Sequence, residues 1–119
     1  EIARRESAKM ILHAVDSIAG KKKAIVTGDF NATPDSEPMQ IILKSKNFHL
    51  TDSKSVSRKP HYGPTGTFNG FESKERDEFP IDYIMFSHGV EVLRHATLSQ
   101  SWMGRFSSDH FPVLATLKL

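Results

Sequence analysis

The sequence has 119 residues, which is enough for one domain and excludes two full domains. It contains no cysteine, which excludes disulfides, thiolate catalysis, iron–sulfur clusters and thiolate zinc sites but leaves the cellular compartment open. The formal net charge of +2 is too small to gather nucleic acid by itself, and no apolar run is long enough to cross a bilayer. We therefore expect a folded, soluble protein, for which cytoplasmic and secreted locations are both allowed.

The N-terminal part predicts a helix, a buried strand and a second helix. Apolar residues recur at spacings of three and four over residues 1–19, which is typical of an amphipathic helix, and Gly20 provides its end. Residues 24–26 are a short apolar run, which predicts a central strand covered on both faces. A second helix is predicted over residues 36–46, with Ser36 as its cap.

The C-terminal part predicts a long loop followed by strands. Residues 51–66 contain many Ser, Lys, Arg, Pro and Gly residues, which is typical of a mobile or functional loop. A short strand is predicted over residues 65–69 and a mixed-charge surface segment over residues 72–78. Three further strands are predicted over residues 81–87, 90–98 and 111–119. The sequence therefore predicts a mixed α/β unit with two helices and a largely antiparallel sheet of about four or five strands.

The run Gly28-Asp29-Phe30-Asn31 follows the predicted buried strand, at the position where open α/β folds bind their ligands. In an extended backbone, Asp29 and Asn31 would face one space while Phe30 faces the core. A carboxylate suits a hard cation or an attacking water, and an amide suits a phosphoryl oxygen. Asp and Asn are also common turn residues, so a purely structural role stays open.

A second candidate is Ser108-Asp109-His110-Phe111-Pro112, just before the last predicted strand. Histidine titrates near neutral pH, and the carboxylate of Asp109 beside it could bind a divalent cation. A third is Asp82, an acidic residue in an otherwise apolar predicted strand, because a buried carboxylate needs a partner. Pairing with His110 would provide that partner and fix the imidazole tautomer. The alternatives are an ordinary surface Asp-His pair and an Asp82 that points to water.

Together these motifs contain the parts needed for metal-assisted phosphoester hydrolysis. On Gly28-Asp29-Phe30-Asn31, Ile81-Asp82-Tyr83-Ile84 and Ser108-Asp109-His110-Phe111-Pro112, in that order, the chain resembles the C-terminal half of the endonuclease/exonuclease/phosphatase superfamily. That superfamily includes pancreatic-type deoxyribonucleases, neutral sphingomyelinases and inositol-polyphosphate 5-phosphatases. The resemblance implies that residues 1–119 form a single partial domain, the C-terminal half of a deoxyribonuclease-I-like four-layer α/β sandwich.

The resemblance also implies a role for each motif residue. Asp29 matches the aspartate that orients or activates the attacking water at the metal site, and Asn31 matches the asparagine that contacts the scissile phosphate. Asp82 matches the carboxylate that bonds the catalytic histidine, and Asp109 matches a metal-site aspartate. His110 matches the histidine itself, either as general base or as a phosphate-stabilising group. The implied cation is Mg²⁺, sometimes Mn²⁺, and the implied reaction is in-line attack of activated water on phosphorus.

The N-terminal half of the superfamily has no counterpart in this sequence. That half carries an early Asn, the Glu that is the principal metal ligand, and usually another catalytic His or Tyr. We therefore expect the isolated chain to supply one sheet and about half of an active site, and to be poorly active or inactive alone. The apolar surface left uncovered would favour self-association or a partner chain.

Specificity in such scaffolds lies in the loops. Besides Asn31, the candidate substrate contacts come from the long loop, the short predicted strand and the segment before the Asp-His pair: His61, Thr67, Asn69, Trp102 and Arg105. Nucleic acid, a phospholipid and a sugar phosphate all stay open as the phosphoester substrate. The alternative function is a non-catalytic binding or interaction module that retains the scaffold. The presence of all five polar motif residues argues against this alternative: Asp29, Asn31, Asp82, Asp109 and His110.

Overall fold

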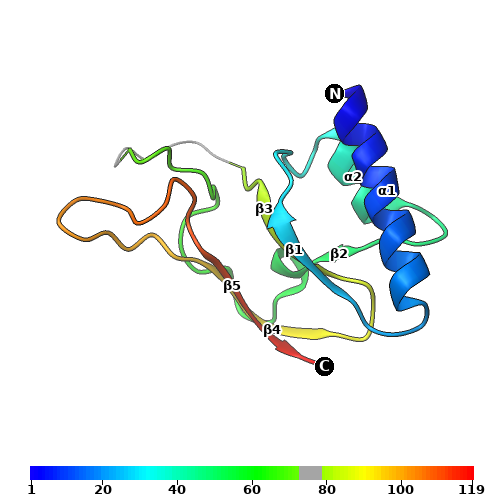
Figure 1. Ribbon diagram of the computed structural model, residues 1–119. Coiled ribbons are helices and arrows are strands. Elements are labelled where there is room, and N and C mark those ends of the chain that lie inside the picture. Colours follow the sequence, from blue (N-terminus) through cyan, green and yellow to red (C-terminus); the bar gives the residue numbers. More distant parts are fainter. Residues whose placement is uncertain (73–78) are drawn as a thin grey trace.

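The computed structural model describes residues 1–72 and 79–119 (Figure 1). The predicted mixed-charge segment therefore lies, beyond Glu72, outside the described residues. In chain order the elements are α1 (Ile2–Ala19), β1 (Ile25–Asp29), α2 (Glu37–Lys44), β2 (Thr51–Asp52), a 3₁₀ helix η1 (Ser53–Val56), β3 (Asp82–Phe86), β4 (Glu91–Thr97) and β5 (Val113–Lys118). The predicted α/β class with two helices and antiparallel strands is confirmed.

Helix α1 forms where the apolar spacing predicts it and ends at Gly20. The backbone of Gly20 has a φ of 57°, and its N–H donates to the carbonyl of Asp16 at 3.0 Å. The predicted apolar face is buried only in the middle of the helix, at Ala8 and Leu12. Ile2 and Ile18, near the two ends of α1, are 70% and 86% exposed, so the apolar face is covered only in part.

Helix α2 is shorter at both ends than predicted and buries Met39 and Ile42. Ser36 does occupy the N-cap position, but its side chain does not cap the helix. Its hydroxyl donates to the carbonyl of Thr33 at 2.6 Å and so stabilises the preceding turn. The start of α2 is thereby tied to the loop that follows β1.

The strands form two antiparallel sheets. In the first sheet the order is β1-β3-β2, and β4 pairs with β5 in the second. The prediction of a covered central strand over residues 24–26 was wrong, because β1 lies at an edge among the described strands and only its Val26 is partly buried. The central strand is β3, whose Tyr83, Met85 and Phe86 are buried.

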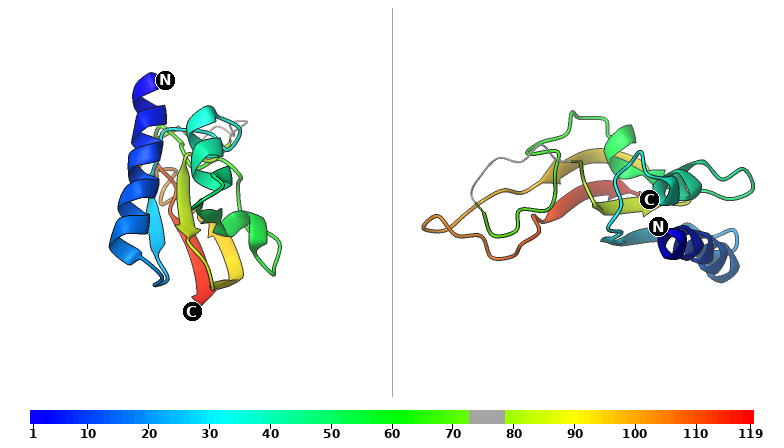
Figure 2. Two further views of the ribbon diagram at one scale, coloured as in Figure 1. Left: turned by 90° about the vertical axis from the view of Figure 1, so that its right-hand side faces the viewer. Right: turned by 90° about the horizontal axis from the view of Figure 1, so that it is seen from above.

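The core lies between the two helices and the three-stranded sheet. Figure 2 shows α1 and α2 together on one side of the strands. The buried apolar cluster draws on both helices, the loops next to them and β3: Ala8, Leu12, Ala32, Met39, Ile42, Leu50, Tyr83 and Met85. Packing against this cluster holds β3, and through it the end of β1, in place.

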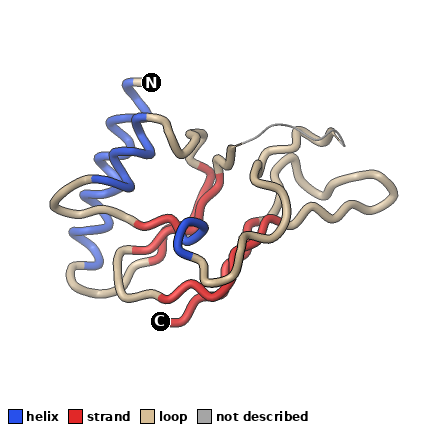
Figure 3. The backbone as a smooth tube through the Cα atoms, turned by 180° about the vertical axis from the view of Figure 1, so that it is seen from behind, coloured by secondary structure: helices blue, strands red, loops and turns tan. Residues whose placement is uncertain are grey.

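The predicted long loop contains more regular structure than expected, because β2 and η1 occupy residues 51–56. The predicted short strand over residues 65–69 is instead an irregular segment with a single bridge, from Phe68 to His110. Figure 3 shows two long loops beyond the ends of the strands. One loop is formed by residues 57–72, which follow η1, and the other joins β4 to β5; the bridge connects them.

Candidate active site

Two carboxylates face each other where β1 ends and β3 begins. The antiparallel register pairs Asp29, the last residue of β1, with Asp82, the first residue of β3. Like charges directly opposite each other on neighbouring strands are destabilising. This arrangement is therefore favourable only with positive charge beside it, either an imidazolium or a metal cation.

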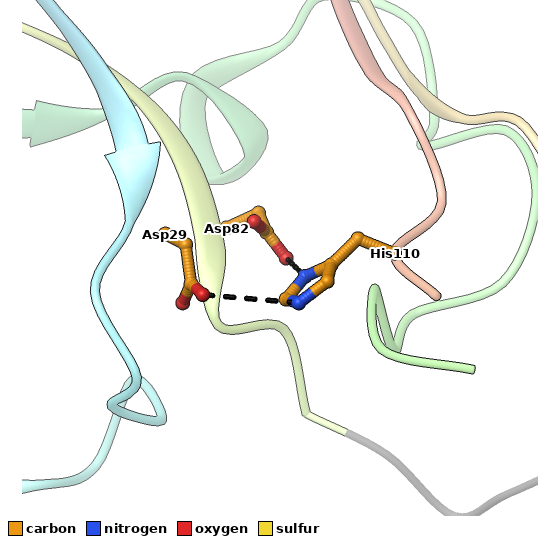
Figure 4. Close-up of side chains that lie close together, drawn as sticks. All are labelled: Asp29, Asp82 and His110. Carbon is orange, nitrogen blue, oxygen red and sulfur yellow. Dashed lines mark hydrogen bonds and ion pairs between the residues drawn. The ribbon is translucent and has the colours of Figure 1, made fainter. Parts of the chain in front are cut away.

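His110 comes from the turn before β5 and lies next to both carboxylates (Figure 4). Its Nδ1 is 2.9 Å from Oδ2 of Asp82, and its Nε2 is 3.8 Å from Oδ2 of Asp29. A carboxylate accepts hydrogen bonds, so Nδ1 carries a proton and donates it to Asp82. The longer distance to Asp29 is not a hydrogen bond, which leaves Nε2 available to another partner.

The environment favours the protonated form of His110. The hydrogen bond to Asp82 raises the pKa of the imidazole above its ordinary value, partial burial opposes the rise, and the charges of Asp82, Asp29 and Asp109 add to it. The side chain keeps 27% exposure, so solvent reaches the ring. His110 can therefore exchange protons with a substrate or with water while Asp82 fixes its orientation.

The backbone turns directly after Asp29, so the extended geometry assumed for residues 29–31 does not continue through Asn31. The backbone N–H of Asn31 donates to Oδ1 of Asp29 at 2.8 Å, which closes a turn immediately after β1. Asn31 has a φ of 47°, in the left-handed region that Asn tolerates well. Its side chain is exposed on the same rim as Asp29, and Phe30 packs against the core as predicted.

Asp109 lies beside His110 in sequence but outside the cluster formed by the other three side chains. Within the part of the chain that the structure describes, Asp29, Asp82 and His110 are the group whose ligand atoms lie within 4.8 Å of one another. The backbone carbonyl of Asp109 instead accepts hydrogen bonds from the N–H groups of Asn69 and Gly70, at 2.7 and 3.1 Å. The metal role of Asp109 stays a prediction.

The remaining candidate substrate contacts fall into two groups. Thr67, Asn69 and His61 turn inward: Thr67 and Asn69 are almost fully buried, and Nδ1 of His61 lies 2.9 Å from Nδ1 of His95. Trp102 and Arg105 are exposed on a tight turn, where each backbone N–H donates to the carbonyl of the other at 2.8 and 2.9 Å. Of these five residues, Trp102 and Arg105 are exposed, His61 is half-buried, and Thr67 and Asn69 are buried.

His95 is a buried polar residue that the sequence analysis did not identify. The imidazole lies on β4, where Thr97, two residues further on, is buried as well. The sequence does show that His95 and Thr97 are two residues apart, so that their side chains lie on the same face of a strand. That spacing does not indicate whether the face is buried or exposed. His95 belongs to the packing behind the site, since it lines one small pocket together with Asp82 and Thr67.

The donor set fits a hard cation held by few protein ligands. One oxygen of Asp82 is bonded to His110, and one oxygen of Asp29 accepts the N–H of Asn31. Oδ2 of Asp29 is free of these bonds and faces the imidazole (Figure 4). A site with few carboxylates suits a hard cation that completes its coordination with water.

The fold and the site define a class of protein: a partial α/β sandwich with an aspartate–histidine pair at the ends of its strands. The family model described as "Endonuclease/Exonuclease/phosphatase family" matches residues 5–110. The chain belongs to this family.

Relatives and solved structures agree with this assignment. The chain is 30% identical over 107 residues to the Endonuclease/exonuclease/phosphatase family domain-containing protein 1 of Bos taurus, covering 84% of this chain and 18% of that protein. An endonuclease/exonuclease/phosphatase from Bacteroides vulgatus superposes with a TM-score of 0.89 at 32% identity, covering 100% of this chain and 45% of that one. The mannosyl-6-phosphatase Bt3783 of Bacteroides thetaiotaomicron superposes with a TM-score of 0.86 at 30% identity, covering 100% and 47%.

The chain therefore spans less than half of these solved structures and about a fifth of the curated relative. The matched residues 5–110 include the first two motifs on which the resemblance was based, and Ser108, Asp109 and His110 of the third. Among the described residues, neither helix has the length and apolar character needed to cross a bilayer.

Proposed function

We propose that this chain carries part of the active site of a metal-dependent phosphoester hydrolase. The observation that supports the proposal most strongly is the convergence of Asp29, Asp82 and His110, which come from three segments far apart in the sequence. Family membership and the likeness to a mannosyl-6-phosphatase support phosphoester hydrolysis as the class of reaction.

The distances suggest how the residues divide the chemistry. An oxygen atom placed about 2.8 Å from both Nε2 of His110 and Oδ2 of Asp29 forms a triangle over their 3.8 Å separation. A water held there can lose a proton to a neutral His110, and a phosphoryl oxygen held there can accept a hydrogen bond from a protonated one. Asp82 holds the ring in the tautomer that keeps Nε2 available.

The cation we propose is Mg²⁺, with Mn²⁺ as a substitute, bound at Asp29 with a contribution from Asp109. When bound, the cation would polarise a phosphoryl oxygen and offset the repulsion between the carboxylates. Because the chain offers few ligands, we expect the isolated chain to bind Mg²⁺ weakly. Isothermal titration tests this directly, and tight binding by the chain alone would contradict the partial-site proposal.

For the substrate, we infer that a compact phosphoester such as a sugar phosphate fits this protein better than long nucleic acid. The net charge of +2 supports this choice, and so does the named activity of the mannosyl-6-phosphatase. A panel of mannose 6-phosphate, p-nitrophenyl phosphate, bis-p-nitrophenyl phosphate, sphingomyelin and plasmid DNA separates the alternatives. Preferred cleavage of the plasmid, with a steep salt dependence, would contradict the inference.

The decisive experiment compares His110→Ala with His13→Ala in the complete gene product, assayed with Mg²⁺. His13 is an exposed residue of α1 and serves as the matched control. We expect His110→Ala to lower kcat by about 10²- to 10⁴-fold, which is the usual contribution of a general acid or base. Equal turnover by the two variants would remove His110 from the mechanism and would favour the non-catalytic alternative.

We also propose that the uncovered edge of β1 promotes self-association of the isolated chain. Beside this edge, a groove of about 530 Å³ runs between β1 and the two helices, and Ile25 of β1 is 45% exposed. Sedimentation velocity over a range of concentrations measures the association. Ile25→Lys should weaken it, and Ile2→Lys, at the exposed start of α1, should not. A monomer at all concentrations would contradict the proposal.

A further inference from the structure

The segment from Thr67 to Asn69 contacts both chain regions that form the Asp82–His110 pair. The side chains of Thr67 and Asn69 are 1% and 3% exposed, so they present almost no surface to a substrate. Their polar atoms are bonded instead to the start of β3 and to the turn before β5. This placement differs from the substrate contact predicted for both residues and indicates another role.

The hydroxyl of Thr67 fixes the backbone that carries Asp82. Its Oγ1 accepts hydrogen bonds from the N–H groups of Ile81 and Asp82, at 3.1 and 3.3 Å. The carbonyl of Ile81 in turn accepts the N–H of Phe30 at 2.8 Å, which extends the connection to the residue after Asp29. Without the hydroxyl, two N–H groups at the start of β3 would lose this acceptor, which is costly in a partly buried site.

The backbone of the same segment fixes the turn that carries His110. The carbonyl of Thr67 accepts the N–H of Phe111 at 2.6 Å, on one side of the histidine. On the other side, Nδ2 of Asn69 donates to the carbonyl of Ser108 at 3.1 Å. The ring of Phe68 stands edge-on to the imidazole, with 5.3 Å between the ring centroids. The residues on both sides of His110 are therefore held by one short segment.

We propose that Thr67 is a positioning residue that holds Asp82 and His110 at hydrogen-bonding distance. Its hydroxyl bonds the strand of one partner, and its carbonyl bonds the turn of the other. The inference deepens the proposed function and rests on it for its catalytic consequence. The geometry it describes can be measured in the chain without turnover.

The test observes the Nδ1 proton of His110 by NMR in the ¹⁵N-labelled chain, together with hydrogen exchange of the Asp82 amide. Thr67→Val keeps the shape of the side chain but removes the acceptor. We expect it to abolish the protected Nδ1–H signal and to speed exchange of the Asp82 amide by about tenfold, the effect of one lost hydrogen bond. Thr67→Ser keeps the hydroxyl and should retain both properties.

Thr97→Val is the matched control. Thr97 is also 1% exposed, and its hydroxyl lies 3.4 Å from Nε2 of His61, a contact that involves neither Asp82 nor His110. A folded Thr67→Val with the wild-type signal and wild-type exchange would overturn the proposal, and so would equal loss of the signal in Thr97→Val. If Thr67→Val does not fold, Thr67→Ser provides the test. Loss of the protected Nδ1–H signal of His110 in Thr67→Ser would also overturn the proposal, because this variant keeps the hydroxyl. Absence of hydrolysis would count against the proposed function and would leave this measurement unaffected.

Discussion

The contact between the half-buried His61 and the buried His95 should make the fold sensitive to mild acid. Nε2 of His61 is 2.9 Å from the carbonyl of Pro64, which only accepts, so Nε2 carries the proton. Nδ1 of a neutral His61 is then an acceptor, and Nδ1 of His95 donates to it across 2.9 Å. This contact requires one Nδ1 to lack a proton, because a proton on both Nδ1 atoms would place two donors against each other.

The magnitude follows from the pKa of His95. Burial is the main cause that lowers the pKa of His95 from its ordinary value of 6.5 to about 4, and the charge of a protonated His61 and that of Lys54 add to the effect. Between these two pH values the unfolded chain binds a proton that the folded chain excludes, so stability is lost as the pH falls from 6.5 to about 4. At about 1.4 kcal/mol for each pH unit, the largest loss is on the order of 3 kcal/mol.

Urea unfolding at pH 7 and at pH 4.5, in the wild type and in His95→Asn, measures this contribution. The asparagine amide can still donate toward His61 but does not titrate. The difference between the two proteins isolates the contribution of His95 from those of the carboxylates and of His110. The raised pKa of His110 stabilises the fold at pH values below 6.5, and this stabilisation is lost as the pH rises above the folded-state pKa of His110. The same loss of stability in both proteins would refute the reasoning.

Two further predictions concern the residues next to the candidate site. Asp82→Asn should lower the pKa of His110, because the bond to the Asp82 carboxylate is the largest cause of its elevation; an unchanged NMR titration midpoint of the imidazole would contradict this. Tyr83→Phe should destabilise the fold by about 1 to 2 kcal/mol, measured by urea unfolding. The Tyr83 hydroxyl lies 2.7 Å from the carbonyl of Ala32 and 3.0 Å from that of Pro80, and wild-type stability in the variant would show that neither contact matters.

Local patterns in the sequence were sufficient for the elements and for one long-range contact. The spacing of apolar residues predicts α1, because a helical stripe is a property of consecutive residues. The cost of an unpaired carboxylate in an apolar strand predicts a partner for Asp82, and the structure places His110 there at 2.9 Å. Both inferences depend on requirements that hold in any fold.

The tertiary structure decided what surrounds those elements. Strand alternation assumed an extended backbone through Asn31, but β1 ends at Asp29, whose carboxylate accepts the N–H of Asn31, and Asn31 has a φ of 47°. A short apolar run cannot indicate whether strands flank it on both sides, so the edge position of β1 could not be read from residues 24–26. The inward position of Thr67 likewise depends on β3 and β5, which approach it from far along the chain. The sequence determines which residues need partners, and long-range packing determines which partners they meet.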